Sequence, residues 1–453
     1  MDITRRGALK SGLLIGGLAL NGKLAQGSPN GNTNTCPDDC LTYFDELPLY
    51  YPGTETLGTN EMRITFLGTW FAERFSQACN SIFVELGNGD NFVFDCGAGV
   101  LAKYNAMGIT QSKLNKVFLT HLHADHMNEL SMLYAFGSSY GRMQPLYVWG
   151  PSRSLKADPS GNIYNDGLAD FCAAIQQAFI WHTQSQSFLA TQVEGWTPPP
   201  WAPQNLVDCY DLVPFELNWN ANPGSIATAG GTAYDYNGVT INYFPSVHNR
   251  AGAIAYKLMW NGLSMIFTGD TKPNKYLIYQ ANGVDVLIHE MTTSPTVWAE
   301  HFSGLQPNPN NPTWVKILSG TQAVQLSSHT VDLAFGYLLN QIATPPSKAP
   351  RLAIATHYPA SDDTIGPSLQ YVRSWYPHGS VIVALDLMVV NVSAQNIEVR
   401  RAVVPQIVWP LIVQMPTGTT APPEYPNPTY QLDQTQLSNT INPSVYDPDG
   451  LES

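Results

Sequence analysis

The chain reads Thr120-His121-Leu122-His123-Ala124-Asp125-His126 immediately after an apolar segment, Lys116-Val117-Phe118-Leu119. Three of the protein's 10 histidines and one carboxylate therefore stand close together in this run. Neutral imidazole and carboxylate groups are suitable ligands for Zn²⁺ and similar divalent ions. Alternate residues of an extended chain share a face, so His121 and His123 can point into one hollow. The run predicts a metal site at the end of a buried strand, with Asp125 and His126 available for a second ion.

Three further polar residues stand at the ends of apolar β-type runs later in the chain, namely His248, Asp270 and His357. Open α/β architectures place their ligands just past the carboxyl ends of strands. The shared placement of these residues, more than any one of them alone, indicates a site that needs more ligands than the first run supplies. The complete set of candidate ligands is His121, His123, Asp125, His126, His248, Asp270 and His357.

Strand and helix patterns alternate on both sides of a less regular middle segment, which predicts an α/β fold. The expected strands are 62–67, 81–86, 91–95, 116–119, 238–245, 253–259, 263–268, 284–289 and 351–356, and the expected helices include 100–107 and 128–136. Residues 151–235 are rich in Pro, Asn, Trp and Gln and predict a long insertion. It either covers the mouth of the site or has no role, and its aromatic residues form either a wall of the site or a small core of their own.

The N-terminal 26 residues resemble a twin-arginine export signal. Arg5-Arg6 precede a short apolar run at 12–20, which is well below the roughly 20 residues that a membrane-spanning helix needs. We therefore expect export by the twin-arginine machinery to the periplasm or beyond, with no stable membrane span. The remaining predicted divisions are an N-terminal arm at 27–60, a catalytic domain at 61–395 and a Pro-rich tail at 396–453.

The net charge limits the expected binding partners, and the expected compartment bears on the state of the cysteines. The formal net charge of −13 opposes binding to nucleic acid, which relies on Lys and Arg, so nucleic acid is not an expected partner. An oxidising destination permits disulfides. Cys36 with Cys40 and Cys172 with Cys209 are the candidate pairs, whereas Cys96 is expected to be a core thiol.

The candidate ligands resemble those of the metallo-β-lactamase fold, and within it the branch of ribonuclease Z and arylsulfatase-like enzymes. Three other segments resemble that branch as well: Phe66-Leu67-Gly68-Thr69, Phe94-Asp95-Cys96-Gly97 and Tyr147-Val148-Trp149-Gly150-Pro151. The resemblance covers about residues 62–150 and 238–360. It implies a four-layer αββα sandwich of two similar halves, here with a long insertion, and a metal site at the edge between the halves.

The resemblance also implies how the ligands divide between two divalent ions, expected to be Zn²⁺ with Mn²⁺ or Fe²⁺ as alternatives. His121, His123 and His248 would hold one ion, and Asp125, His126 and His357 the other. Asp270 would bridge the two. Such a pair of ions can share a hydroxide, which would be the nucleophile.

Several neighbouring residues receive roles from the same resemblance. Asp125 would orient the hydroxide or take its proton. His329, in Ser328-His329-Thr330, is a candidate general acid or oxyanion stabiliser, with a purely structural position before the next helix as the alternative. Glu290 is expected to orient a ligand imidazole. His289 receives no role.

The predicted function is that of an exported dinuclear metal-dependent hydrolase that cleaves a phosphodiester or sulfate ester of a small molecule. A lactone or other ester hydrolase on the same site is one alternative, and a non-catalytic metal-binding module of the same fold is another. The RNA substrate of ribonuclease Z is disfavoured by the export signal, the acidic charge and the absence of an obvious basic arm. A β-lactamase activity is the weaker hypothesis, because β-lactamases of this fold generally lack the pattern of the Gly269-Asp270 pair.

Overall fold

The computed structural model describes residues 47–185, 192–193, 195–206, 209–361, 363–405 and 419–420. The predicted signal at 1–26, most of the predicted arm, Cys36 and Cys40, and most of the predicted tail lie outside the described residues. None of the helices within the described ranges has both the length and the apolar character that a membrane-spanning segment requires.

The first of two large sheets has nine strands and contains the sequence around the histidine-rich run. Strands β4, β5, β6 and β8 are parallel to one another, so the carboxyl end of β5 opens directly into the His121–His126 segment. In spatial order the strands are β1 (Leu49–Tyr50), β17 (Ile397–Ala402), β16 (Met388–Val392), β2 (Met62–Gly68), β3 (Ser81–Leu86), β4 (Asn91–Phe94), β5 (Lys116–Phe118), β6 (Leu146–Pro151) and β8 (Leu212–Leu217).

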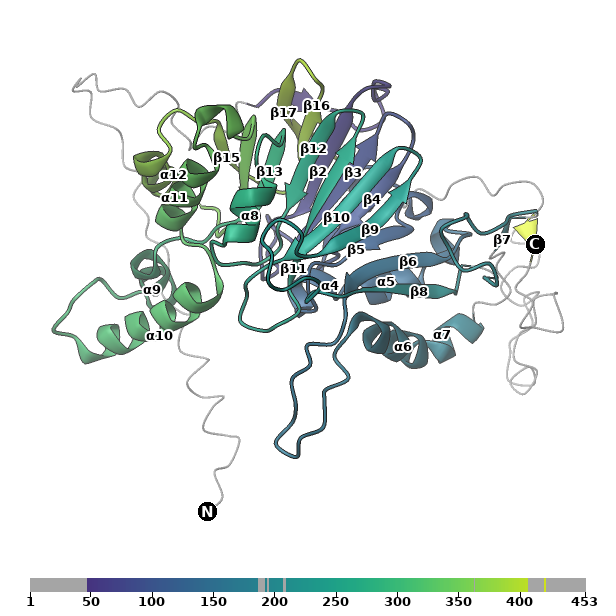
Figure 1. Cartoon of the computed structure of the whole chain (residues 1–453), viewed down its shortest axis with the longest axis horizontal. Coiled ribbons are helices and arrows are strands. Elements are labelled where there is room, and N and C mark those ends of the chain that lie inside the picture. The colour runs from purple at the N-terminus through teal and green to yellow at the C-terminus, as the bar shows by residue number, and fades with distance from the viewer. Residues whose placement is uncertain are drawn as a thin grey trace, which may run out of the picture. The chain divides into compact units, whose positions relative to one another are not determined.

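The second sheet has seven strands and faces the first (Figure 1). Strands β9 to β12 pair antiparallel, whereas β12 to β15 are parallel. Its spatial order is β15 (Val381–Val383), β14 (Leu352–Thr356), β13 (Val286–Glu290), β12 (Leu263–Phe267), β11 (Ile254–Trp260), β10 (Val239–Pro245) and β9 (Gly231–Tyr236). A separate two-stranded pair joins β7 (Gln192–Val193) and β18 (Thr419–Thr420).

A buried aromatic core joins the two sheets. Phe118 of the first sheet stacks on Trp149 with ring centroids 4.5 Å apart and meets the edge of Tyr256 of the second sheet at 5.5 Å. Burying such rings supplies a large part of the hydrophobic stabilisation of a core. Because alternate residues of each strand face opposite ways, the outer faces of both sheets are also apolar and need helices to cover them.

Helices cover both outer faces. The first sheet packs on α3 (Val100–Ala106), α5 (Leu130–Ala135) and α6 (Leu168–Ala178), and the second on α8 (Lys275–Gln280), α11 (Asp332–Ile342) and α12 (Ile365–Trp375). The four-layer αββα sandwich is thereby confirmed. Shorter elements are α4 (Ala124–Met127), α7 (Ile180–Ser185) and the 3₁₀ turns at Gln111–Lys113, Ser138–Tyr140 and Pro346–Lys348.

Two helices that the sequence analysis did not predict form a pair beside the sandwich, α9 (Pro295–Ser303) and α10 (Pro312–Ser328) (Figure 1). Each begins with a side-chain cap followed by proline: Ser294 accepts from the backbone N–H of Val297, and Asn311 from that of Thr313 at 3.0 Å. The base of the pair is closed by backbone hydrogen bonds. Thr292 N–H donates to the carbonyl of Thr330 at 2.9 Å, so the chain leaves and re-enters the sandwich at one point.

The segment expected to be an insertion is largely built into the sandwich. Residues 151–235 include α6, β8 and β9, and the two strands are edge strands of the two sheets. Trp201 packs on Tyr147 at 4.7 Å and on Tyr234 at 5.5 Å, within the main core and not in a core of its own. Strand β17 similarly lies inside the segment predicted as a tail. In these strands, tertiary packing overrides a sequence that looks irregular.

The predicted Cys172–Cys209 disulfide is wrong for this structure. Cys172 is a free thiol, so it forms no disulfide with Cys209; both are buried, as are Cys79 and Cys96. Cys172 packs in the apolar layer between α6 and the first sheet, and burial raises the pKa of its thiol to about 12. A buried cysteine of this kind behaves as a small hydrophobic residue.

Candidate metal centre

The seven predicted ligands meet at one edge of the sandwich, each at or just past the carboxyl end of a strand. The four in the run His121–His126 follow β5 of the first sheet, with His126 on the short helix α4. His248, Asp270 and His357 follow β10, β12 and β14 of the second sheet. The centre is therefore assembled from both halves of the fold.

The first group of ligand atoms belongs to His121, His123, His248 and Asp270, and these atoms lie within 4.8 Å of one another. Nδ1 of His123 is 3.0 Å from Nε2 of His121 and 3.3 Å from Nε2 of His248. Burial holds the pKa of His121 well below its usual value, and the pKa values of His123 and His248 are lowered for the same reason. Neutral imidazole is the form that binds a metal ion.

The second group belongs to Asp125, His126, Asp270 and His357. Nε2 of His126 is 3.2 Å from Oδ2 of Asp125 and 3.2 Å from Oδ1 of Asp270, and Nε2 of His357 is 3.1 Å from Oδ2 of Asp125. Asp270 is common to both groups. The structure thus brings the seven side chains into the two sets that the family resemblance implies, with Asp270 between them.

Two atoms at the middle of the centre test whether these residues suit a metal ion. Nε2 of His126 and Oδ1 of Asp270 are buried, and although they lie 3.2 Å apart, neither makes a hydrogen bond of acceptable geometry in the described part of the chain. Leaving a buried polar atom unpaired costs about 1–3 kcal/mol, so such atoms are normally satisfied. A divalent cation would satisfy both, and nitrogen with carboxylate oxygen is a donor set that Zn²⁺ accepts. The residues fit a metal centre with room for two ions; the number and identity of the ions stay predictions.

Asp95, which the sequence analysis quoted only as part of a family segment, positions one of the ligands. His126 Nδ1 donates to Oδ2 of Asp95 at 2.7 Å, which leaves Nε2 free to face the centre. The fully buried carboxylate also accepts from the backbone N–H of Thr120 at 2.8 Å and from its hydroxyl. The placement of Asp95 directly after β4 was the available signal, since it repeats the pattern of the predicted ligands.

The backbone around the centre is unusually constrained. Asp95, Gly269 and His357 follow strands and have φ values of 56°, 56° and 55°, in the left-handed region. A Cβ on Gly269 would lie 2.3 Å from the hydroxyl oxygen of Thr120, which belongs to the other half of the sandwich. Only glycine allows the two halves to approach this closely while the chain turns toward Asp270.

His329 stands at the end of α10 beside the two groups of predicted ligands, and with Glu290, His248 and Asp270 it forms a third group of side chains that could hold a metal ion. Its Nδ1 donates to Oε2 of Glu290 at 2.8 Å and lies 3.8 Å from Oδ2 of Asp270. Burial opposes a charge on this imidazole, but the Glu290 carboxylate outweighs burial and raises the pKa of His329 to about 9. Glu290 was expected to orient a ligand imidazole; it instead holds His329. His289 is buried and stacks on Phe335 at 5.1 Å, which is a packing role.

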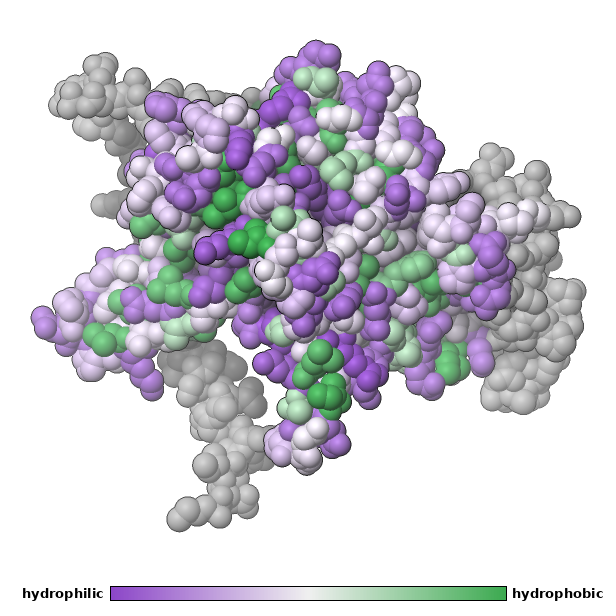
Figure 2. All heavy atoms as spheres, viewed as in Figure 1, coloured by the Kyte–Doolittle hydropathy of each residue, from purple (hydrophilic) through white to green (hydrophobic). Residues whose placement is uncertain are grey.

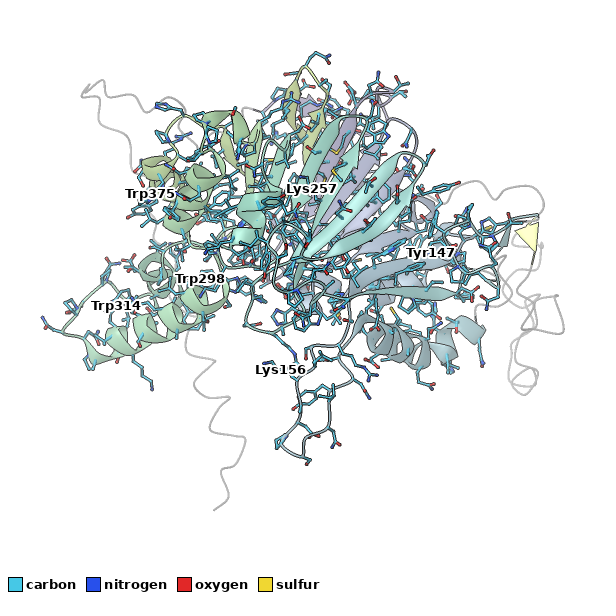
Figure 3. The ribbon with its side chains drawn as sticks, viewed as in Figure 1. Tyr147, Lys156, Lys257, Trp298, Trp314 and Trp375 are labelled. Carbon is cyan, nitrogen blue, oxygen red and sulfur yellow. The ribbon has the colours of Figure 1, made fainter. Side chains whose placement is uncertain are left out.

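A cavity of about 1060 Å³ opens onto the centre. Five of the predicted ligands border it, together with His329, whereas its other walls are mainly apolar and come from residues 70–71 and from α9 and α10. Figure 3 shows Trp298 and Trp314 on this helix pair, and Figure 2 shows hydrophobic residues on its face. None of the described residues of 151–235 borders this cavity. Of the two alternatives left open for the aromatic residues of 151–235, a wall of the site and a small core of their own, the wall is excluded for this cavity, whose apolar side chains come from other segments.

The chain is similar in sequence to one family model and to ribonuclease Z proteins. The family described as "Anti-Pycsar protein Apyc1" matches residues 62–153. Ribonuclease Z of Mycobacterium bovis is 27% identical over 229 residues, which are 50% of this chain and 69% of the relative. Ribonuclease Z of Halalkalibacterium halodurans is 26% identical over 253 residues, 51% of this chain and 76% of the relative.

Solved structures of similar architecture include the metallo-β-lactamase fold protein YhfI from Bacillus subtilis. It has a TM-score of 0.45 and 15% identity, and the match covers 73% of this chain and 100% of that one. The short form of human tRNase Z has a TM-score of 0.44 and 18% identity, covering 72% and 98% of the two chains. The two-sheet topology, the seven converging side chains and the sequence relatives lead to one conclusion: this chain has the metallo-β-lactamase fold and is related in sequence to ribonuclease Z.

Proposed function

We propose that the protein is a metal-dependent hydrolase that cleaves a phosphodiester, or a sulfate ester, of a small molecule. The observation that carries this proposal is the convergence of seven ligand side chains with His329 at the edge of one cavity. When bound, divalent ions lower the pKa of water and stabilise negative charge on an ester oxygen. The chain's own residues supply the rest of the chemistry.

Asp125 and His329 are the two groups proposed to handle protons. Burial opposes ionisation of Asp125, but His126 and His357 hold the pKa of its carboxyl below the usual range, so it is an acceptor at neutral pH. His329 is held by Glu290 in the protonated form and can donate to an oxygen that leaves. An acceptor and a donor that border the same cavity suit the hydrolysis of an ester.

The size and charge of the substrate are proposed from the surroundings of the centre. The formal net charge of −13 disfavours a polynucleotide, and the main cavity carries only one basic side chain that is not a histidine, Lys316. We also propose that the protein is exported by the twin-arginine machinery and acts in the periplasm or beyond. This rests on Arg5-Arg6 and the apolar run at 12–20, and its test is N-terminal sequencing of the exported protein.

The proposal is tested by metal analysis followed by a panel of substrates: bis(p-nitrophenyl) phosphate, p-nitrophenyl sulfate, a chromogenic lactone and a chromogenic β-lactam. We expect metal-dependent turnover of the phosphodiester or the sulfate. Turnover of the lactone alone would favour the other-ester alternative. Absence of turnover from protein that carries its full metal content would instead favour a non-catalytic binding module.

His329→Gln tests the proposed donor. Glutamine can still form a hydrogen bond but cannot deliver a proton, so kcat should fall by about 10²–10⁴-fold. The measured metal content should stay that of the unaltered protein, because His329 is not among the seven predicted ligands. An unchanged kcat would assign His329 a structural position only.

A further inference from the structure

We propose that the cavity between α10 and the metal centre binds a long apolar chain of the substrate, with the scissile ester at the ligand end. The inference rests on the proposed hydrolase function and names its substrate class: an ester of a long alkyl or similarly apolar chain. The cavity extends well beyond what the ester group itself needs, and at about 1060 Å³ it is at the upper end for a small-molecule site.

One face of α10 lines the cavity along most of the helix. The lining positions include Thr313, Ile317, Gly320, Val324 and Ser328, which are separated by three or four residues and therefore form a single stripe. At 1.5 Å per residue, this stripe extends roughly 22 Å from Thr313 to Ser328. Ser328 is at the centre, because its carbonyl accepts from Nδ1 of His248 at 2.8 Å. The stripe is therefore a track that leads away from the ligands.

Another part of the cavity wall is a cluster of aromatic rings that continues to a ligand. Trp298 of α9 lies 5.7 Å from Trp70 and 5.7 Å from Phe71, measured between ring centroids. Phe71 lies 6.1 Å from the imidazole of His357. An apolar chain that enters along α10 would thus remain in contact with hydrophobic side chains up to the reacting bond.

The free protein leaves part of this apolar surface in water. Phe302 is 76% exposed and Val324 is 60% exposed, although both border the cavity. Covering them with an apolar chain gains the hydrophobic free energy that the protein alone does not realise. Lys316 borders the cavity at the outer half of the helix, where its stem can lie along the chain while its ammonium group reaches water.

Gly320 marks open space in the middle of the track. A Cβ at this position would meet no atom within 4 Å. Glycine within a helix is less favourable than alanine by about 1 kcal/mol, so a side chain here would be tolerated by the helix. Gly320→Leu would therefore fill part of the cavity without disturbing the metal ligands. Ser319→Leu is the matched control, because Ser319 is exposed and does not border the cavity.

The test uses full-length, metal-loaded protein and a series of p-nitrophenyl alkyl phosphate diesters from methyl to dodecyl, below their micelle concentrations. We expect kcat/KM to rise by about two- to fourfold per methylene until the track is filled. Gly320→Leu should reduce the dodecyl-to-methyl ratio of kcat/KM at least tenfold, whereas Ser319→Leu should keep the full ratio. A flat series, or equal effects of the two variants, would overturn the proposal.

Calorimetric titration with alkyl phosphates separates this inference from the hydrolase proposal. Affinity that rises from butyl to dodecyl phosphate and is lost in Gly320→Leu supports the apolar track even if no diester is hydrolysed. Turnover of the methyl diester without any dependence on chain length supports the hydrolase and overturns the track. Sedimentation could instead show a protein dimer that forms whatever the alkyl chain of the ligand and that dissociates in Gly320→Leu. This result would mean that α10 binds a second copy of the protein, and it would also overturn the proposed track.

Discussion

Asp95 acts on the centre through a single hydrogen bond to His126. A carboxylate that accepts from the distal nitrogen of a ligand histidine fixes the ring's orientation and makes the metal-facing nitrogen a better donor. Asp95→Asn keeps the shape but removes the charge. We expect metal affinity to fall by about 10–100-fold, measured by competition with a chromogenic chelator.

Asp235→Asn is a suitable control for Asp95→Asn, because Asp235 is an exposed carboxylate on β9 away from the ligands. It should bind metal as the unaltered protein does. Equal affinities for the two variants would contradict the role that the 2.7 Å contact gives to Asp95.

Gly269 sets how closely the two halves of the sandwich approach. Gly269→Ala would place a Cβ against Thr120 and hold a non-glycine residue at a φ of 56°. We expect the free energy of unfolding to fall by at least about 2 kcal/mol, measured by denaturant titration of the metal-free protein. Gly238→Ala shares the positive φ, at 75°, but meets nothing within 4 Å, so it should cost clearly less. Equal losses would mean that the contact with Thr120 is unimportant.

The ligands could be predicted from sequence because their signal is local. Each imidazole or carboxylate stands where an apolar run ends, and strand ends of an α/β fold meet at one edge. The placement of Asp95 at the end of a strand follows the same pattern, but its contact with His126 and the pairing of His329 with Glu290 could not be derived in this way. They depend on distances between residues that are far apart in the chain, which no local pattern records.

Among the elements, α10 forms the track proposed for the substrate, and its start depends on one side chain. Asn311 accepts from the backbone N–H groups of Thr313 and Trp314. Asn311→Ala should destabilise the helix start by about 1 kcal/mol. Hydrogen exchange should then quicken in the first turn of α10 and remain unchanged in β13.

Asn311→Asp provides the corresponding rescue, since aspartate caps helices as well as asparagine does. Slow exchange at the start of α10 should return in this variant. Fast exchange in both variants would show that the cap is not what holds the first turn.

The elements divide into those that sequence patterns reveal and those that packing decides. Strands such as β3, β10 and β14 are regular apolar runs, and their bounds agree with the prediction to within a residue or two. Strand β8 is an edge strand, and β17 lies between β1 and β16. Both have mixed composition and are held by pairing, β8 with β6 and β17 with β16. Helices α9 and α10 carried signals in Ser294-Pro295 and Asn311-Pro312, which are typical helix starts.

At the scale of the whole molecule, the ligands come from both sheets, so metal binding should stabilise the complete sandwich. Ligand binding to the native state raises stability by about 2.7 kcal/mol at a hundredfold excess over Kd. We expect removal of metal with a chelator to lower the Tm by several degrees and readdition of Zn²⁺ to restore it, measured by calorimetry. The pairing of the two halves then depends on the ions as well as on the aromatic core.

Asp270→Ala is the matching control for chelation. It removes the carboxylate that is common to both groups of ligands, so its Tm should respond little to chelator or to Zn²⁺. A full response in this variant would place the stabilising metal elsewhere in the protein.

The closed base of the α9–α10 pair has a consequence for how such proteins diversify. Thr292 and Thr330 are joined by a backbone hydrogen bond, so the two ends of the segment that contains α9 and α10 lie side by side at the edge of the sandwich. A segment with adjoining ends can be shortened, lengthened or traded for another without re-threading the sheets that carry the histidines. Exchanging the segment between these two residues would change the substrate specificity and keep the metal centre. Chimaeras joined at Thr292 and Thr330 are therefore suitable for testing altered substrate choice.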